Sequence, residues 1–465
     1  MVDLVVLGAG PVGENLAQYA TQGTDLTAVL VERELVGGEC SFYACMPSKA
    51  LLRPVDVVDT AQHLGGVAGA RLDVAGTLAR RDAWVRDYDD ASQVQWAAGV
   101  GIEVVRGEGR ISGIRTVTVA TPDGTRTLRA RHAVALATGS EPVVPEMYAA
   151  CLPWGSRDAT GVVEVPERLA IIGGGVVAVE AATWMAALGS QVTMVVRDDR
   201  LLRQVEPFAG ELVLASLRRA GVDVRLGTTA LGADRLDVAD RGLGRVHGGR
   251  VRLTLAGGEE VVADELLVAV GRLPRLGDVG LASVGLTPGD VLRGDLPDWL
   301  VAVGDANGEP ALTHWGKYRA RVRGPELAAR ATGALPPKPP PEDVPVPQVV
   351  FTDPQVASVG MTQAQAEAAL PGTRAVQVPW TSAAGAALLR DDAAGAAQLV
   401  VDDVARVVVG ATFVGPEAGE LLHAATIAIV GQVPVDLLRH AVPSYPTASE
   451  LWLRLLEKLD EEDRS

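Results

Sequence analysis

Short apolar runs alternate with glycine turns and mixed polar stretches along the first part of the chain. One run spans Val2–Leu7 and a second spans Leu26–Val31, and a helix-like stretch continues from the glycine turn between them to about Gln22. Apolar runs of this length, bounded by turn residues, predict buried strands. We therefore expect the chain to begin with a strand, a helix and a second strand.

The same arrangement recurs in the middle of the chain. Strands are predicted at Arg168–Ile172 and Gln191–Val196, with a helix at Glu180–Leu188 between them. A further apolar strand is predicted within Val301–Ala306, where the apolar run ends in a Gly-Asp pair. Repeated units of this kind predict an α/β fold with two Rossmann-like nucleotide-binding domains.

Proline interrupts the pattern at Pro336–Pro341, which predicts an extended linker to a C-terminal α+β domain at about residues 345–465. In that domain the apolar positions predict strands followed by two helices. The expected elements are the strands Ala375–Val378, Ala397–Val401 and Arg406–Val414 and the helices Glu417–Val430 and Ala448–Leu459.

Size and charge narrow the classes of function. The chain has 465 residues, 48% of them apolar, and a formal charge of -16. This length suggests about three domains, and the negative charge disfavours nucleic acid and anionic membranes as partners. The N-terminus lacks the basic region of a signal peptide, and no apolar run reaches the roughly 18–20 residues of a membrane span. A cytoplasmic location without membrane contact is expected.

The first glycine turn has the spacing of a dinucleotide-binding fingerprint. Gly8, Gly10 and Gly13 precede the predicted helix, and Glu32 ends the second strand. Glycines let the backbone approach a pyrophosphate, the helix N-terminus stabilises its charge, and an acid about twenty residues later suits ribose hydroxyls. A bound dinucleotide is expected here.

The second glycine turn, with Gly173 and Gly175, indicates a second nucleotide site. Arg197 stands where an acidic residue would select NAD, and Arg203 follows shortly after. Arginine accommodates the 2′-phosphate of NADP. NADPH is the expected coenzyme, and NADH is less favoured, although Asp198 and Asp199 lie between the arginines.

Two of the three cysteines, Cys40 and Cys45, lie in one hexapeptide between these nucleotide sites. In a reducing compartment such a close pair is more often catalytic than structural, whereas Cys151 is expected to be structural. A position near a helix N-terminus favours the Cys45 thiolate. With two nucleotide sites, the pair predicts electron transfer from nicotinamide through a flavin to sulfur. Asp305 is expected to accept a hydrogen bond from a ribityl hydroxyl.

Over nearly its whole length, and in order, the chain resembles the pyridine nucleotide–disulfide oxidoreductases, which include dihydrolipoamide dehydrogenase, glutathione reductase and mercuric reductase. The segments that carry the resemblance are Gly8–Gly13, Gly37–Lys49, Ala137–Ser140, Gly173–Glu180, Ala269–Arg272, Gly304–Asp305, Leu312–His314, Phe351–Pro354 and Ser358–Thr362. The last two look like the family's dimerisation domain.

The resemblance implies a homodimer that binds FAD and NAD(P)H and shares each active site between its subunits. Cys45 would face the flavin, Cys40 would attack the substrate, and Lys49 and Glu180 would pair beside the flavin. Further cofactor contacts are expected at Gly38, Gly109, Thr138, Gly139, Gly271 and Gly304. The implied domains are an FAD domain at residues 1–145 and 275–335, an NAD(P) domain at 146–274, a linker at 336–347 and a dimerisation domain at 345–465.

The C-terminal segment departs from the family pattern. The family's His-Pro-Thr-x-x-Glu motif is here Tyr445–Glu450, so Glu450 is retained and tyrosine replaces histidine. A phenol with a pKa near 10 is not a base at neutral pH, so ordinary disulfide turnover is expected to be slow. His440 is expected to be a surface or core residue. Glu39 and Val176 also replace family residues, a threonine that bonds the cofactor and a bulky side chain that covers the flavin.

The leading hypothesis is therefore an FAD-dependent NADPH oxidoreductase that reduces a Cys40–Cys45 disulfide and passes the electrons to an unidentified disulfide or other small acceptor. One alternative is a metal-ion reductase of the mercuric type, although the chain lacks that type's C-terminal cysteine pair. A second is a quinone or diaphorase-type reductase that does not use the thiols. A third, which the intact sites disfavour, is a flavin-binding scaffold without activity.

Overall fold

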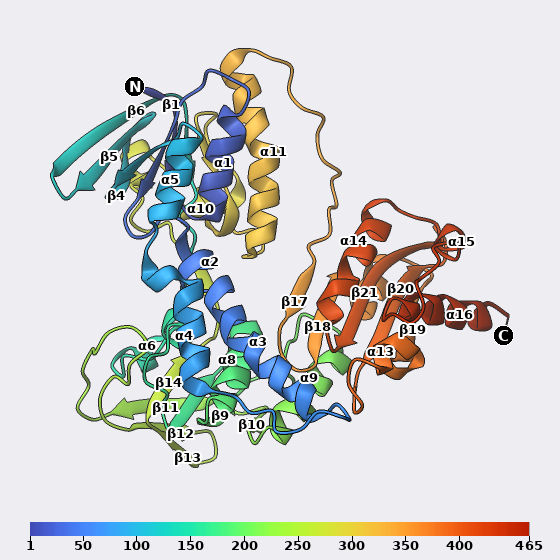
Figure 1. The fold of residues 1–465 in the computed structure, drawn as a ribbon. Helices are drawn as coiled ribbons and strands as arrows, with labels where there is room; N and C mark the ends of the chain where they lie inside the picture. Colours follow the sequence, from blue (N-terminus) through green and yellow to red (C-terminus); the bar gives the residue numbers. More distant parts are fainter. Residues whose placement is uncertain (465) are drawn as a thin grey trace. The chain divides into compact units, whose positions relative to one another are not determined.

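The computed structural model describes residues 1–464, and its contacts group the chain into two compact units (Figure 1). The first unit contains Met1–Pro47, Arg80–Val143 and Gly271–Glu342. The second contains Ser48–Ala79, Val144–Val270 and the chain from Asp343 onward. The α/β fold class predicted from the sequence is confirmed, and the three-domain boundaries stay a prediction.

The first unit is built on a seven-stranded sheet with the order β3-β2-β1-β6-β5-β4, to which β16 adds beside β6. Its strands are β1 (Val2–Leu7), β2 (Ala28–Glu32), β3 (Glu103–Arg106), β4 (Glu108–Gly113), β5 (Thr116–Thr121), β6 (Gly124–Leu136) and β16 (Leu300–Ala302). β1, β2, β3 and β16 join the sheet in parallel, whereas β4, β5 and β6 form antiparallel pairs. A short ribbon pairs β7 (Ser140–Pro142) with β15 (Arg272–Pro274).

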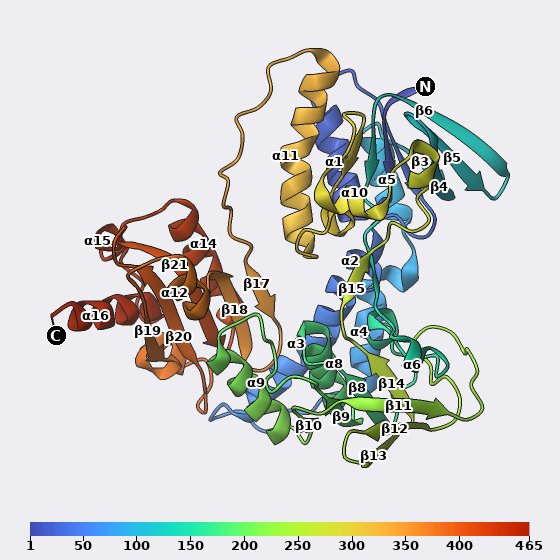
Figure 2. The ribbon, with the colours of Figure 1, turned by 180° about the vertical axis from the view of Figure 1, so that it is seen from behind.

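Both faces of the parallel part of this sheet are covered. Along β1, Val5 and Leu7 belong to one apolar cluster, whereas Leu4 and Val6 belong to another on the opposite face. This alternation explains why the strand is a nearly continuous apolar run. Helices α1 (Pro11–Thr21) and α11 (Thr313–Thr332) lie side by side in both views of the ribbon (Figures 1 and 2).

Further helices lie wholly or partly in the first unit, between its strands in the sequence. They are α2 (Gly38–Phe42), α3 (Cys45–Gln62), α4 (Val74–Trp84), α5 (Ala91–Gly99) and α10 (Pro288–Arg293), with 3-10 turns at Arg86–Tyr88, Leu281–Val284 and Gly304–Asn307. Helices α3 and α4 each run from one unit into the other.

The second unit contains a parallel four-stranded sheet with the order β10-β9-β8-β14. Its strands are β8 (Arg168–Ile172), β9 (Gln191–Val195), β10 (Asp223–Arg225) and β14 (Glu265–Val268), accompanied by α6 (Glu146–Ala149), α7 (Ser156–Thr160), α8 (Val176–Ala187) and α9 (Pro207–Arg219). An antiparallel sheet of β11 (Ala230–Arg235), β12 (Val251–Leu255) and β13 (Glu260–Ala263) lies in the same unit.

The C-terminal part of this unit is an antiparallel sheet with the order β17-β18-β21-β20-β19. Its strands are β17 (Gln348–Val350), β18 (Gln355–Gly360), β19 (Thr373–Pro379), β20 (Ala396–Asp402) and β21 (Val407–Gly415). The helices are α12 (Gln363–Ala369), α13 (Ala384–Ala387), α14 (Leu422–Val430), α15 (Val435–Leu438) and α16 (Glu450–Arg464), with 3-10 turns at Trp380–Ser382 and Ala418–Leu421.

The predicted elements are present, with shifted ends. Helix α8 begins at Val176, directly after the glycine turn, instead of at Glu180, and the proline-rich segment contains no helix or strand. The helix expected from Glu417 begins as a 3-10 turn, and the last helix starts and ends later than expected. Within residues 1–464, none of the helices combines the length and apolar character needed to cross a membrane.

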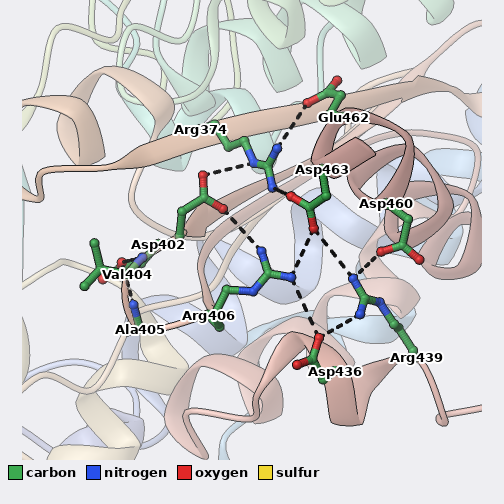
Figure 3. A network of polar contacts seen from close by, with 11 residues as sticks. Arg374, Asp402, Val404, Ala405, Arg406, Asp436, Arg439, Asp460, Glu462 and Asp463 are labelled. Carbon is green, nitrogen blue, oxygen red and sulfur yellow. Dashed lines mark hydrogen bonds and ion pairs between the residues drawn. The ribbon is translucent and has the colours of Figure 1, made fainter. Parts of the chain in front are cut away.

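An ionic network fixes the end of α16 (Figure 3). The Asp463 carboxylate lies against Arg374 of β19, 3.2 Å from a guanidinium nitrogen of Arg406 and 3.9 Å from one of Arg439. The hydrogen bond from Arg374 is the main cause that lowers the pKa of Asp463. Because three cations share one carboxylate, the network ties the C-terminal helix to the sheet and to the turn before β21.

We predict that Asp463→Asn lowers the thermal unfolding midpoint at pH 7 and low salt by about 1–3 °C, since exposed networks contribute little each. A carboxyl whose pKa is lowered in the folded state stabilises the fold above its ordinary pKa and loses this effect as the pH falls. The difference between variant and parent should therefore disappear in acid. Glu461→Gln, which disturbs only an exposed pair with Lys458, is the matched control; an equal loss in both variants would contradict the prediction.

Candidate active site

The glycine turn after β1 allows two backbone segments to touch. Gly8 has a φ of +99°, and a Cβ there would lie 2.3 Å from the carbonyl oxygen of Ala137. A Cβ on Gly13 would lie 2.1 Å from the carbonyl oxygen of Gly8. No side chain fits at either position, so the sequence needs glycine here to pack helix α1 against the sheet.

The N-terminus of α1 is shaped to receive an anion. Gly10 precedes the helix in an extended conformation, Pro11 occupies the first turn, and no side chain caps the free N–H groups. Gly38 approaches from the start of α2, where an added Cβ would lie 2.8 Å from the Gly10 Cα. Two glycine turns therefore present bare backbone and helix N–H groups, a donor set that fits the pyrophosphate of FAD.

Glu32 is held at the other side of this turn. Its carboxylate accepts hydrogen bonds of 2.8 Å from the backbone N–H of Ala9 and of Glu34. Both bonds fix the carboxylate at the end of β2 beside the glycine turn. This is the position that a ribose-binding acid requires in the dinucleotide fold.

The two cysteines are brought together by a break between helices. Cys40 lies on the short helix α2, and Cys45 is the first residue of α3. The Cys45 sulfur lies 3.3 Å from the Thr313 hydroxyl at the start of α11. The neighbouring Cys45 sulfur and burial together raise the pKa of Cys40, whereas Thr313 and Lys317 lower it. Both residues are free thiols in this structure.

A chain of polar contacts joins four of the predicted site segments. Glu39 lies 3.7 Å from Arg272, whose guanidinium donates 2.8 Å hydrogen bonds to the hydroxyl and the carbonyl of Ser140. The Ser140 hydroxyl bonds Asp305 in turn. The Thr138 hydroxyl donates to the carbonyl of Arg275 at 2.7 Å. Glu39 thus has an ionic partner that the family's threonine at this position would not need.

The structure also places the remaining predicted glycines of the first unit. Gly139 is in a left-handed conformation, and an added Cβ there would have no atom within 4 Å. The carbonyl oxygen of Gly271 accepts a hydrogen bond from the backbone N–H of Val143. Gly304 faces Val12 of α1, with 3.1 Å between its added Cβ and that side chain. Gly109 lies in β4, where an added Cβ would meet Leu7 and Val31 at 2.6 and 2.8 Å, which gives this glycine a packing reason.

A hollow of about 410 Å³ borders the cysteine hexapeptide. Phe42, Met46, Trp84 and Arg86 are among the residues that line it. The Trp84 side chain is 48% exposed and that of Met46 is 38% exposed, so apolar surface is open to solvent beside the two cysteines.

The second nucleotide turn repeats the first within the second unit. Gly173 has a φ of +123°, and its added Cβ would lie 2.3 Å from the carbonyl oxygen of Ala269. Gly175 precedes α8 in an extended conformation without a side-chain cap, and an added Cβ there meets nothing within 4 Å. The donor set again fits the pyrophosphate of a dinucleotide.

The two arginines of this site share one acidic partner. Arg203 lies 2.9 Å from Asp198, and Arg197 lies 3.9 Å from the same carboxylate oxygen. Both side chains are well exposed, at 80% for Arg197 and 62% for Arg203. Asp198, which follows Arg197 directly in the sequence, is therefore the carboxylate neighbour of both guanidinium groups.

Lys49 and Glu180 form an ion pair of 2.7 Å. Glu180 is buried on α8, and its second oxygen accepts a 2.9 Å hydrogen bond from the backbone N–H of Phe351. The Lys49 ammonium also lies 4.6 Å from the centre of the Phe351 ring. The carboxylate is thereby satisfied on both oxygens, which makes this buried charge tolerable.

Tyr445 and Glu450 differ in their surroundings. The Tyr445 side chain is 77% exposed, whereas Glu450 is buried at the start of α16 and accepts a 3.5 Å hydrogen bond from the N–H of Gly385. His440 is exposed as well. Apolar side chains of Ile427, Val430 and Val442 share this exposure in the same C-terminal part.

Three functional candidates escaped the sequence analysis as individual residues: Thr313, Lys317 and Glu14. Thr313 belongs to a segment that carries the family resemblance, and its contact with Cys45 identifies its role. Lys317 and Glu14 carry no motif, because only the fold brings the Lys317 charge near Cys40 and Glu14 near Lys317. Among residues 1–464 no cluster of three His, Cys, Asp or Glu side chains could hold a metal ion.

Two family models match the chain. The pyridine nucleotide-disulphide oxidoreductase model matches residues 2–293, and the dimerisation domain of the same family matches residues 346–455. The chain belongs to the pyridine nucleotide-disulphide oxidoreductase family. It is thus an FAD-dependent pyridine nucleotide–disulfide oxidoreductase, as the sequence predicts, and its dimerisation domain indicates a homodimer.

Members of this family with curated names and solved structures match over almost the whole chain. Dihydrolipoyl dehydrogenase from Haloferax volcanii is 32% identical over 98% of this chain and 95% of its own length. The enzyme of that name from Thermus scotoductus is also 32% identical, over 98% and 97%.

Two solved structures share the fold. A Cu(II) complex of the HOCl-induced flavoprotein disulfide reductase RclA from Escherichia coli has a TM-score of 0.82, at 21% identity over 98% of this chain and 99% of its own. LpdA from Mycobacterium tuberculosis has a TM-score of 0.82, at 22% identity over 99% and 100%.

Proposed function

We propose that this oxidoreductase uses NADPH to reduce its Cys40–Cys45 pair and passes the electrons from Cys40 to an acceptor outside the chain. The observation that carries the proposal is the pairing of the two sulfurs beside Thr313, in the same unit as the FAD-binding glycine turn. The relatives named dihydrolipoyl dehydrogenase support a dithiol or disulfide as the acceptor class.

FAD, when bound, supplies the step that converts a hydride into electrons for a disulfide. The chain positions the sulfurs for this exchange. Cys45 gains thiolate character from the N-terminus of the 18-residue helix α3, and Thr313 can donate a hydrogen bond to its sulfur. The family resemblance assigns to Cys40 the mixed disulfide with the acceptor, and because burial and the Cys45 sulfur raise the pKa of Cys40, this thiol must lose its proton before it can attack.

We predict that two-electron reduction by NADPH gives a long-wavelength charge-transfer band from the Cys45 thiolate to oxidised flavin. Cys45→Ser should abolish this band, and Cys40→Ser should show it without any reductant, because the thiolate then has no disulfide partner. Stopped-flow absorbance measures both. Direct bleaching of the flavin in the parent, with no such band, would rule out the sulfur relay and favour a reductase that bypasses the thiols.

Coenzyme choice follows from the arginine pair. The exposed guanidinium groups of Arg197 and Arg203 follow β9, after which the dinucleotide fold places the residues that contact the ribose, and we propose that they contact the 2′-phosphate of NADP. Charge-assisted hydrogen bonds to a phosphate are the stronger class of hydrogen bond. We therefore assign NADPH as the preferred coenzyme.

The double change Arg197→Ala and Arg203→Ala should raise KM for NADPH at least tenfold and leave KM for NADH nearly unchanged. Each contact is expected to contribute about 1.5–3 kcal/mol. Steady-state kinetics with both coenzymes is the measurement. Arg219→Ala, an exposed arginine on α9, is the control, and equal efficiency of NADH and NADPH in the parent protein would contradict the assignment.

The identity of the acceptor depends on Tyr445. In the proposed homodimer we expect the exposed phenol to reach the partner's active site, where a tyrosine would not act as a base near neutral pH. The exposed apolar side chains of Met46 and Trp84 in the hollow beside the hexapeptide favour a second candidate function, the reduction of quinones. The Cu(II) complex of RclA makes metal ions a third acceptor class to include in a screen.

Tyr445→His should increase the reduction of a small disulfide by up to about 10². Reduction of a quinone should hardly change, since that reaction does not need a proton shuttle to sulfur. Turnover of both acceptors is compared with Tyr445→Phe, which removes only the hydroxyl. If disulfide reduction stays at the level of the parent, Tyr445 lies outside the site or serves another acceptor.

A further inference from the structure

The hollow beside the cysteine hexapeptide has an apolar wall and a single charge. Phe42, Met46 and Trp84 supply the apolar wall. Among the seven lining residues, all of them in the first unit and in the described chain, Arg86 alone is charged. Phe42 belongs to the hexapeptide and Met46 directly follows Cys45, so a ligand in the hollow would contact the segment that carries both sulfurs. A volume of about 410 Å³ suits a small molecule.

The Arg86 guanidinium is not neutralised by a carboxylate. It is exposed and donates a hydrogen bond to the Ser92 hydroxyl, which is uncharged. Nearby acids have other partners: Asp90 pairs with Arg106, and Asp89 accepts a 2.8 Å hydrogen bond from a backbone N–H of α5. Within residues 1–464, no carboxylate forms an ion pair with Arg86. A cation at an apolar wall, without an acidic partner, is suited to an anionic group on an apolar ligand.

Arg86 lies in an unusual backbone conformation. The φ angles of Arg86, Asp87 and Tyr88 are +51°, +49° and +62°, so three successive residues other than glycine are left-handed. For L-amino acids this conformation costs about 1–2 kcal/mol per residue. Such strain persists where surrounding contacts fix it, and it is concentrated at binding and catalytic sites. A strained turn that lines the hollow therefore indicates a function for the residue it presents.

The contacts that fix this turn come from the hexapeptide. The Tyr88 ring stacks on the Tyr43 ring, with 5.4 Å between the ring centroids. Tyr43 lies within the hexapeptide, between the two cysteines. The backbone N–H of Tyr88 also donates a 2.8 Å hydrogen bond to the carbonyl oxygen of Val85, which closes the turn. The turn thus holds the Arg86 guanidinium at the hollow, at a position fixed relative to the cysteine segment.

We propose that the hollow binds the apolar, carboxylate-bearing arm of a disulfide acceptor. The side chains of Phe42, Met46 and Trp84 contact the apolar arm, and Arg86 pairs with the carboxylate and determines specificity. The proposal deepens the proposed function and rests on it in one respect, that the acceptor's disulfide reacts at Cys40. In that exchange the two cysteine thiols become a disulfide and the acceptor's disulfide becomes a dithiol, so two electrons and two protons are transferred.

Binding of a sulfur-free probe tests the hollow without any redox step, so failure of the sulfur relay would not affect the result. Octanoate has an apolar arm and a carboxylate, whereas octanamide has the same arm without the charge. Isothermal titration calorimetry on the oxidised holoenzyme gives the dissociation constant of each. Octanoate should bind about tenfold more tightly than octanamide, because it adds a charge-assisted contact.

Arg86→Gln should remove this preference: the dissociation constant of octanoate should rise about tenfold and that of octanamide should change less than about twofold. Arg86→Lys should keep most of the preference, because the charge is retained. Trp84→Ala should weaken both probes alike, because it removes apolar contact area. Arg126→Gln, which changes an exposed arginine paired with Glu103 in the same unit, is the matched control and should alter nothing.

Two substitutions of Asp87 separate the turn from the charge. Asp87→Gly and Asp87→Val both remove the carboxylate, but glycine adopts a positive φ readily and a β-branched residue does not. Relative to Asp87→Gly, Asp87→Val should weaken octanoate about threefold and leave octanamide unchanged, because the strained turn is costlier to maintain. Equal octanoate binding by the two variants would show that the turn does not position Arg86.

Turnover connects the hollow to the acceptor. Lipoate and lipoamide share a dithiolane ring and differ in the carboxylate, so the parent should reduce lipoate with the higher kcat/KM and Arg86→Gln should abolish that difference. Equal binding of octanoate and octanamide by the parent, or a preference that survives Arg86→Gln, would overturn the proposal. Binding of the neutral quinone menadione but not of octanoate would also overturn it and assign the hollow to quinones. If octanoate binds as expected and neither dithiolane is reduced, the carboxylate site is supported and the disulfide acceptor of the proposed function is what fails.

Discussion

The close approach of backbone to backbone at the two glycine turns is the constraint on which the rest of the first unit depends. Gly8 lies against Ala137 and Gly38 lies against Gly10, so close that a Cβ on Gly8 or on Gly38 is excluded. These approaches bring α1 onto the sheet and the start of α2 onto α1. The groups of the sulfur site lie on α2, at the first residue of α3 and on α11, which packs beside α1.

The close packing of the two cysteines explains why a few neighbouring groups control which sulfur ionises. Two neighbouring thiols disfavour a second negative charge, so the environment of each sulfur decides which one ionises. Cys45 stands at the N-terminus of the long helix α3, whereas the Thr313 hydroxyl acts on both sulfurs and Lys317 lowers the pKa of Cys40. This asymmetry supports a division of labour in which one sulfur faces the cofactor and the other faces the acceptor.

The structure shows the surroundings of each residue that departs from the family pattern. Glu39 introduces a negative charge beside Cys40, and this charge is paired with the Arg272 guanidinium. Val176 packs against the apolar cluster that contains the buried residues of α8. Tyr445 is exposed in the single chain, whereas Glu450 is buried, so the two residues of the altered motif have separate roles within the subunit.

The sequence by itself determined the fold class, both nucleotide turns, the cysteine pair and the family. These features depend on short-range rules: apolar periodicity defines strands, and a turn with positive φ or a backbone contact requires glycine. Helix ends were less well predicted, because α8 begins at the glycine turn itself and α16 is extended by its ionic network. Only the tertiary structure decided which charges meet Cys40. Thr313 and Lys317 both come from α11, far along the chain from the hexapeptide, and their effect on Cys40 depends on distance and burial, which no local pattern encodes.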